Sequence, residues 1–169
     1  MKLLGIGSML LASLGFGLVS LSEKRERMGC LRDLCAALAL FRAELGSTRV
    51  PLPRLIHELC GKARGQAACF LRTLDASLEQ LGERSFCELW EAAANETLPL
   101  LTLEEREALN QCGKLLGRFS LEEQLAALDE LQRRFASALD REQQVYREDK
   151  KLRLWLPTAA GALLVILLL

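Results

Sequence analysis

The stretch SLEEQLAALDELQRRFASAL, residues 120–139, contains both the start of a helix and the apolar stripe that would bury it. Ser120 and Glu123 match the capping box, in which the hydroxyl accepts from the third helical amide and the glutamate bonds back to the cap amide. Apolar side chains then recur at the spacing of an amphipathic helix: Leu121, Leu125, Leu128, Leu131, Phe135 and Leu139. Because residues 121–153 contain no glycine or proline, they are predicted to form one long helix.

The rest of the middle of the chain is predicted to be helical as well. Two further capping boxes, Ser85 to Glu88 and Thr102 to Glu105, each follow a glycine or proline and precede an apolar stripe. Helical periodicity also predicts a helix at about 23–45, one at 52–63, and one that follows Gly65 and contains apolar residues as far as Leu81. No alternating strand pattern is present. The predicted fold class is all-α, a six-helix bundle.

Both ends of the chain contain an uncharged segment, from Leu3 to Leu21 and from Leu154 to Leu169. A helix of about 20 apolar residues crosses the hydrocarbon core of a bilayer, and the shorter second segment can span if flanking basic side chains extend to the headgroups. The sequence therefore predicts transmembrane helices at 1–22 and 154–169 around a helical domain at 23–153. A cleaved signal peptide is the alternative for the first segment. The basic residues that follow it, Lys24, Arg25 and Arg27, resist translocation and favour an uncleaved anchor.

Basic residues also predict the orientation of the chain. Lysine and arginine flank the inner ends of both segments, whereas the outer ends carry only Lys2. Positive charge favours the cytoplasmic side, so a cytoplasmic domain at the cell membrane is predicted, with both termini outside. The cysteines lie within apolar helical patterns and are expected to be reduced and buried: Cys30, Cys35, Cys60, Cys69, Cys87 and Cys112.

Charge is divided along the predicted domain. Residues 22–74 carry ten basic and five acidic side chains, and residues 131–153 carry seven basic and four acidic ones. Residues 75–130 between them carry thirteen acidic and four basic side chains. The basic segments suit the anionic lipid headgroups of a bilayer. The acidic segment suits a protein partner with a basic surface and disfavours nucleic acid as a ligand.

Catalytic and metal-binding motifs find little support in the sequence. The chain has one histidine and lacks a nucleophile elbow, a phosphate-binding loop and a zinc-protease motif. His57 and Cys60 share a helix face and could form half of a metal site, but no second pair of ligands is evident. The glutamates at 104, 105 and 107 lack the alternating ligands of a calcium loop and suit a helix start instead. We therefore expect a protein without enzymatic activity or cofactor.

Two stretches carry a resemblance to a known family. They are FRAEL at 41–45 followed by Pro51 and Leu52, and LLGRFSLEEQ at 115–124. With Trp90 after the third helix, and with the order anchor, six helices, apolar tail, the chain resembles the stage III sporulation protein AB family of endospore-forming bacteria over nearly its whole length. The positions that carry this resemblance are Glu44, Pro51, Leu52, Trp90, Gly117 and Gln124.

The resemblance implies a helical domain similar to the cytoplasmic domains of type II secretion F platform proteins. It also implies a membrane scaffold in the channel complex between mother cell and forespore, on the mother-cell side of the outer forespore membrane. Its implied partners are a cytosolic ATPase, stage III sporulation protein AA, and other membrane components of the channel. With the division of charge, this leads to the hypothesis that the ATPase docks on Glu104, Glu105, Glu107, Glu122 and Glu123. The alternative is a platform or assembly protein of another type II secretion or pilus-like system, although such proteins usually carry two modules and more membrane spans.

Overall fold

A computed structural model describes the backbone of residues 2–47 and 50–168 and the side chains of residues 22–47 and 50–147. These residues confirm the all-α prediction and the six α-helices. The elements are α1 (Lys2–Ser47), α2 (Leu52–Cys60), α3 (Gly65–Ser77), the short 3-10 helix η1 (Leu78–Gln80), α4 (Phe86–Thr97), α5 (Leu103–Leu115) and α6 (Leu121–Leu168).

Helices α1 and α6 are each longer than the domain helices predicted from the sequence. Helix α1 joins the first uncharged segment and the first predicted domain helix without a break, and α6 likewise runs through the second uncharged segment. The side chains of both segments lie outside the described residues. Within the part of the chain whose side chains the structure describes, no helix is long and apolar enough to cross a membrane.

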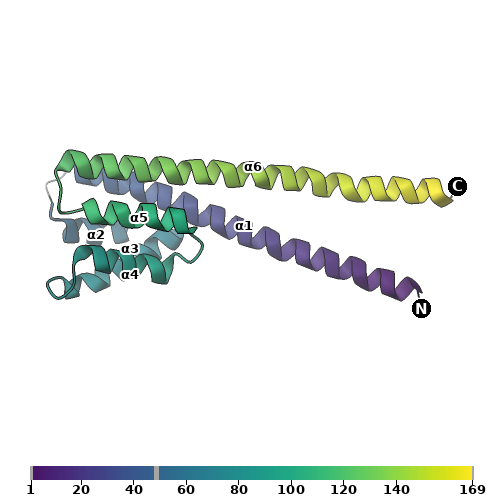
Figure 1. The fold of residues 1–169 in the computed structure, drawn as a ribbon, viewed down its shortest axis with the longest axis horizontal. Coiled ribbons are helices and arrows are strands. Elements are labelled where there is room, and N and C mark those ends of the chain that lie inside the picture. Colours follow the sequence, from purple (N-terminus) through teal and green to yellow (C-terminus); the bar gives the residue numbers. More distant parts are fainter. Residues whose placement is uncertain (1, 48–49, 169) are drawn as a thin grey trace.

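The helices pack so that their contacts lead from α1 through α3, α4 and α5 to α6 and back to α1. Helix α6 packs along α1, α3 packs on α1 and α2, and α4 and α5 complete the path from α3 back to α6. At one end of the bundle, here called the neck end, α1 and α6 both continue beyond the short helices (Figure 1). The start of α2, the connection from η1 to α4 and the connection from α5 to α6 lie at the opposite, distal end (Figure 1).

Trp90 of α4 lies at the centre of the hydrophobic core. Its ring is almost perpendicular to those of Phe70 and Phe41, with centroid distances of 4.9 and 6.5 Å. The indole Nε1 donates a hydrogen bond to the Leu109 carbonyl oxygen of α5 at 3.0 Å. A Cβ atom on Gly113 of α5 would lie 2.5 Å from indole Cδ1, so the lack of a side chain there allows α5 to approach the ring. Trp90 therefore connects α1, α3, α4 and α5.

The predicted helix starts are confirmed in detail. Ser85 and Thr102 each form a complete capping box, with Glu88 and Glu105 respectively. At the start of α6, Ser120 N donates to Glu123 Oε2 at 3.0 Å and Glu123 N donates to Ser120 Oγ at 3.3 Å. These side chains satisfy amides that have no partner within the helix.

Some residues predicted to lie in the core are exposed instead. Helix α3 ends at Ser77, so Leu81 follows η1 and is 46% exposed. Leu121 is the first residue of α6 and is 47% exposed. Among the cysteines only Cys30 and Cys112 are fully buried, and Cys69 is exposed. The second predicted helix is also shorter than expected, since α2 ends at Cys60 and a turn follows.

Candidate functional site

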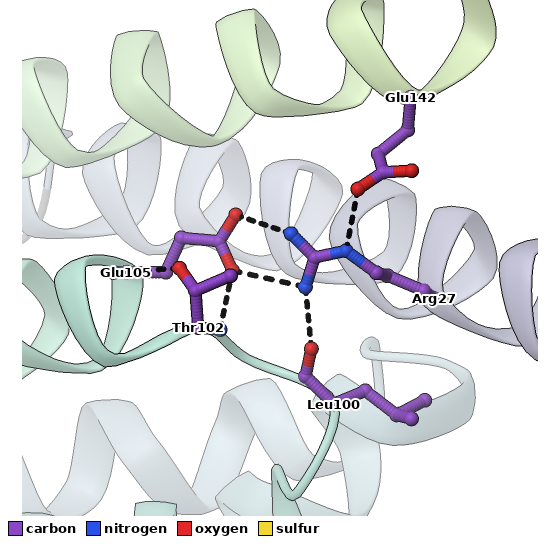
Figure 2. A network of polar contacts seen from close by, with 5 residues as sticks. All are labelled: Arg27, Leu100, Thr102, Glu105 and Glu142. Atoms are coloured by element: carbon purple, nitrogen blue, oxygen red, sulfur yellow. Dashed lines mark hydrogen bonds and ion pairs between the residues drawn. The ribbon is translucent and has the colours of Figure 1, made fainter. Parts of the chain in front are cut away.

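At the neck end, the guanidinium of Arg27 in α1 binds three other parts of the chain (Figure 2). Nη2 donates to Glu105 Oε1 at 2.8 Å, and Nε donates to Glu142 Oε1 of α6 at 2.7 Å. Nη1 donates to Glu105 Oε2 at 3.2 Å and to the Leu100 carbonyl oxygen between α4 and α5. Burial opposes the charge of the guanidinium, but its hydrogen bonds to Glu105 and Glu142 outweigh that effect and raise the pKa of Arg27.

A capping box holds Glu105 in position for this network. Its Oε2 accepts from Thr102 N at 2.8 Å, and Thr102 Oγ1 accepts from Glu105 N at 3.3 Å. Only 10% of the Glu105 side chain is exposed. In the folded domain the Glu105 carboxylate binds Arg27 and stabilises the neck end, and its role in docking a partner stays a prediction.

The two other glutamates predicted on α5, Glu104 and Glu107, are exposed at the neck end. Glu104 and Glu105 border an open groove of about 440 Å³ between α5 and α6. The α6 side of this groove carries Arg133, Arg134 and Arg141 together with Glu130, whose carboxylate pairs with Arg133 and Arg134. Acidic charge on the first turn of α5 therefore borders a mixed cluster of charges on α6.

Glu122 and Glu123 lie at the distal end, in the first turn of α6. Glu122 is exposed, and Glu123 belongs to the Ser120 capping box. Helix α5 has 13 residues and separates this turn from the α5 glutamates, which corresponds to about 20 Å along the axis at 1.5 Å per residue. The fold thus brings Glu104, Glu105 and Glu107 together at one end and Glu122 and Glu123 together at the other.

The connection between α5 and α6, residues 116–120 and here called the distal turn, is fixed by Gln124. Its Oε1 accepts from Gly117 N at 3.2 Å, and its Nε2 donates to the Phe119 carbonyl oxygen at 2.7 Å. Gly117 has φ of 75°, a conformation that favours glycine. A Cβ atom at Gly117 would also lie 3.3 Å from Leu52 Cδ2, so the start of α2 packs close to this turn.

The positions that carried the family resemblance therefore have structural roles. Gly117, Gln124 and Leu52 form the distal turn and its neighbour, and Trp90 is the centre of the core. The Pro51 carbonyl oxygen accepts the first hydrogen bond of α2, from Leu55 N at 3.1 Å. Glu44 of α1 accepts from Lys62 Nζ at 2.5 Å. Apart from the helix start at Pro51, these contacts were not evident from the local sequence.

The structure also shows the surroundings of His57, which together with Cys60 could form half of a metal site. His57 Nδ1 lies 2.9 Å from Asp75 Oδ2, and both residues are on the surface of α2 and α3. Within the described residues, no group of three or more His, Cys, Asp or Glu side chains is arranged to hold a metal ion. Burial raises the pKa of Cys30 to about 11 and that of Cys112 to about 12, so both thiols remain protonated near neutral pH.

Comparisons with known proteins identify the family. The family model described as stage III sporulation protein AB matches residues 2–169. A solved structure titled stage III sporulation protein AB has a similar fold, with a TM-score of 0.63 and 21% sequence identity, covering 72% of this chain and 97% of the other. A search of curated proteins gave no significant match. Because the family model spans almost the whole chain, the chain belongs to the stage III sporulation protein AB family.

Proposed function

We propose that this protein is a non-catalytic membrane scaffold of the channel complex between mother cell and forespore. Residues 1–22 and 154–169 would cross the membrane, and the helical domain would lie in the mother-cell cytoplasm at the outer forespore membrane. There it would dock an ATPase of the stage III sporulation protein AA type and contact other membrane components of the channel. Family membership supports a role in sporulation.

The observation that carries this proposal is the shared direction of α1 and α6. Both helices leave the bundle at the neck end, and both continue without interruption into the uncharged segments (Figure 1). One membrane could therefore hold both segments while the bundle stays on one side of it. The basic residues Lys24, Arg25 and Arg32 of α1 and Arg141 and Arg147 of α6 lie toward this end, where they suit anionic headgroups.

This orientation gives the two groups of glutamates different environments. The glutamates of α5 would be on the membrane side of the bundle, where Glu104 and Glu105 border the groove that also carries the α6 arginines. Glu122 and Glu123 would be on the side that faces the cytosol. Electrostatic attraction between acidic and basic surfaces speeds association and favours the correct partner.

A binding measurement with the full chain in lipid nanodiscs tests the docking role. The ligand is the purified stage III sporulation protein AA of the same organism, and the test variant reverses the three exposed glutamates, Glu104→Lys, Glu107→Lys and Glu122→Lys. We expect at least a tenfold loss of affinity at low salt, which corresponds to about 1.4 kcal/mol, and a smaller loss at high salt.

A control variant with the same change in charge is Glu23→Lys, Glu26→Lys and Glu58→Lys, which lies in the basic part of the chain and should bind normally. Glu105 and Glu123 stay unchanged because they form capping boxes. Absence of binding by the unmodified chain would contradict the docking role. Equal affinity of the test variant at low salt would contradict docking through these glutamates.

A further inference from the structure

The hydrophobic core stops before α1 and α6 leave the bundle at the neck end. Toward this end, the last buried apolar side chains among the described residues are Met28 of α1 and Ala138 of α6. The next turns of the two helices, SEKRER at 22–27 and DREQQVYR at 140–147, are mostly polar, and Val145 is 45% exposed. Burial of apolar surface stabilises the rest of the bundle, but it contributes little to the separation of α1 and α6 at this level.

Polar side chains join α1 to α6 in this region instead. Arg27 Nε donates to Glu142 Oε1 at 2.7 Å, and both side chains are partly buried. Closer to the two chain ends, Arg25 Nε donates to Tyr146 Oη at 3.0 Å on the exposed surface. Water and salt weaken the contacts of exposed charged side chains more than those of partly buried ones. The pair of Arg27 and Glu142 is therefore the stronger of these two contacts.

The start of α5 holds the same guanidinium from another side. Nη1 and Nη2 bind the two carboxylate oxygens of Glu105, and Nη1 also binds the Leu100 carbonyl oxygen (Figure 2). All three nitrogen atoms of Arg27 therefore have partners, which belong to α5, α6 and the connection between α4 and α5. A guanidinium is planar and rigid, so the angles between its N–H groups are fixed. A shift of Glu105 consequently turns the Nε–H group relative to Glu142.

The support behind Glu105 is well ordered. Thr102 N donates to Glu105 Oε2 at 2.8 Å within the capping box, and only 10% of the Glu105 side chain is exposed. In the connection before this cap, Leu98 is fully buried and Leu101 is 7% exposed. The connection and the first turn of α5 are thus fixed to each other and to the core. We expect them to move together when α5 is displaced.

We propose that Arg27 is a coupling residue, which transmits the position of the α4–α5 connection to the separation of α1 and α6 where these helices leave the bundle. Networks of hydrogen bonds and ion pairs between rigid helices can carry such coupling. Coupling is reciprocal, so a change in the spacing of α1 and α6 also shifts the start of α5. This inference goes beyond the proposed function, because it requires neither a membrane nor an ATPase.

A distance measurement between α1 and α6 tests the coupling in the full chain, kept in a non-denaturing detergent. Spin labels are attached through p-acetylphenylalanine at Ser22 and Gln144, which are both exposed, so the native cysteines stay unchanged. Double electron–electron resonance then gives the distribution of distances between the labels. A second pair of labels at Ala39 and Ala126, exposed residues of α1 and α6 within the bundle, reports whether the bundle itself stays intact.

Glu105→Gln is the decisive variant, because it changes α5 alone. Glutamine can still complete the capping box, but it has no charge and its amide nitrogen cannot accept a hydrogen bond from Arg27. Glu104→Gln is the matched control, since Glu104 is exposed and shows no hydrogen bond or ion pair among the described side chains. We expect a narrow distribution between positions 22 and 144 for the unmodified chain and the control. Glu105→Gln should give a broader distribution that extends to longer distances.

Two further variants examine the guanidinium and its bond to α6. Arg27→Lys should broaden the distribution in the same way, because an ammonium group lacks the fixed fork that binds both glutamates. Glu142→Gln removes the charged partner on α6 directly and should also broaden it. If Arg27 links the two glutamates, adding Glu142→Gln to Glu105→Gln should have little further effect, because residues of one network do not act independently.

Two outcomes would overturn the proposal, and both leave the proposed function untouched. If Glu105→Gln keeps the distribution between positions 22 and 144 as narrow as in the unmodified chain, the position of α5 is not transmitted to α6. If the distribution between positions 39 and 126 broadens to the same extent, the substitution loosens the whole bundle and Arg27 does not couple its elements. Broadening at the neck alone is the result that the proposal predicts.

Discussion

Replacing Gly113 by alanine would place a methyl group against the indole ring of Trp90. The new Cβ atom would lie 2.5 Å from Cδ1, 2.7 Å from Cγ and 2.9 Å from Nε1 of the ring. The ring has little freedom to move away, because Phe70 and Phe41 pack on it and Nε1 is bonded to the Leu109 carbonyl oxygen. Relief therefore requires a shift of α5 away from α4.

The size of the effect follows from three contributions. Alanine in a helix interior gains about 0.5–1 kcal/mol over glycine. Overpacking of a core costs about 1–3 kcal/mol, and a displaced indole that loses its hydrogen bond adds about 1–3 kcal/mol for an unsatisfied buried donor. We expect Gly113→Ala to lower the free energy of unfolding by about 3 kcal/mol.

Gly29→Ala is the matched control, because a Cβ atom at Gly29 of α1 would have no neighbouring atom within 4 Å. This variant should gain about 0.5–1 kcal/mol, so the same chemical change should have opposite signs at the two positions. Urea unfolding of the full chain in a non-denaturing detergent, followed by circular dichroism, measures both. Equal stabilisation by the two substitutions would refute the close packing of α5 on Trp90.

Three further predictions concern the distal turn, the helix caps and the thiols. Gln124→Ala removes two hydrogen bonds of the distal turn and should lower the free energy of unfolding by about 1–3 kcal/mol. The control Gln144→Ala, on the exposed face of α6, should change it by less than about 0.5 kcal/mol. Equal effects of the two substitutions in urea unfolding would contradict the role of Gln124 in fixing the distal turn. Hydrogen bonding to Ser85 lowers the pKa of Glu88. The Glu88 carboxylate therefore contributes fully to stability above the ordinary glutamate pKa of about 4.3. This contribution is lost as the pH falls through the lowered pKa. Thermal unfolding between about pH 5 and pH 2 should show a weaker pH dependence for Glu88→Gln than for the unmodified chain, and equal slopes would contradict this role. In the folded, purified protein a maleimide should label Cys69 quickly and Cys112 only after unfolding, as measured by intact mass, and fast labelling of Cys112 would contradict its burial.

Local signals in the sequence predicted the helices and their starts well. A capping box lies within four residues and an apolar stripe within a few turns, so both can be read from the sequence alone. Errors occurred where a helix ended or began at the surface. The spacing of Leu81 continued the pattern of α3, and that of Leu121 began the pattern of α6, but about half of each side chain is exposed in the folded domain.

The candidate site depended on contacts that a local pattern does not contain. Arg27 is 78 residues from Glu105 and 115 residues from Glu142 in the sequence, so their pairing is created by the packing of α1 against α5 and α6. The glutamates of residues 104–123 were close in sequence and were expected to form one surface. Because α5 and α6 are antiparallel, the fold places their first turns at opposite ends of the bundle.

In the proposed scaffold, the two ends of the bundle have different roles. At the neck end, Arg27 holds α1, α5 and α6 together where α1 and α6 leave the bundle (Figure 2). At the distal end, Phe119 of the distal turn and Glu122 of α6 are exposed. A domain held at its neck by two membrane helices would present that turn to the cytosol.

Membrane topology tests this account most directly, and Cys69 is a suitable probe because it is exposed on α3. A membrane-impermeant maleimide is applied before and after permeabilisation to vegetative cells that express the chain, where the outer side of the cell membrane is open to the reagent, and a cysteine added after Leu169 serves as the control for that side. The account predicts that Cys69 is labelled only after permeabilisation and that the added cysteine is labelled in intact cells. Labelling of Cys69 in intact cells would contradict a cytoplasmic domain and the proposed docking of a cytosolic ATPase.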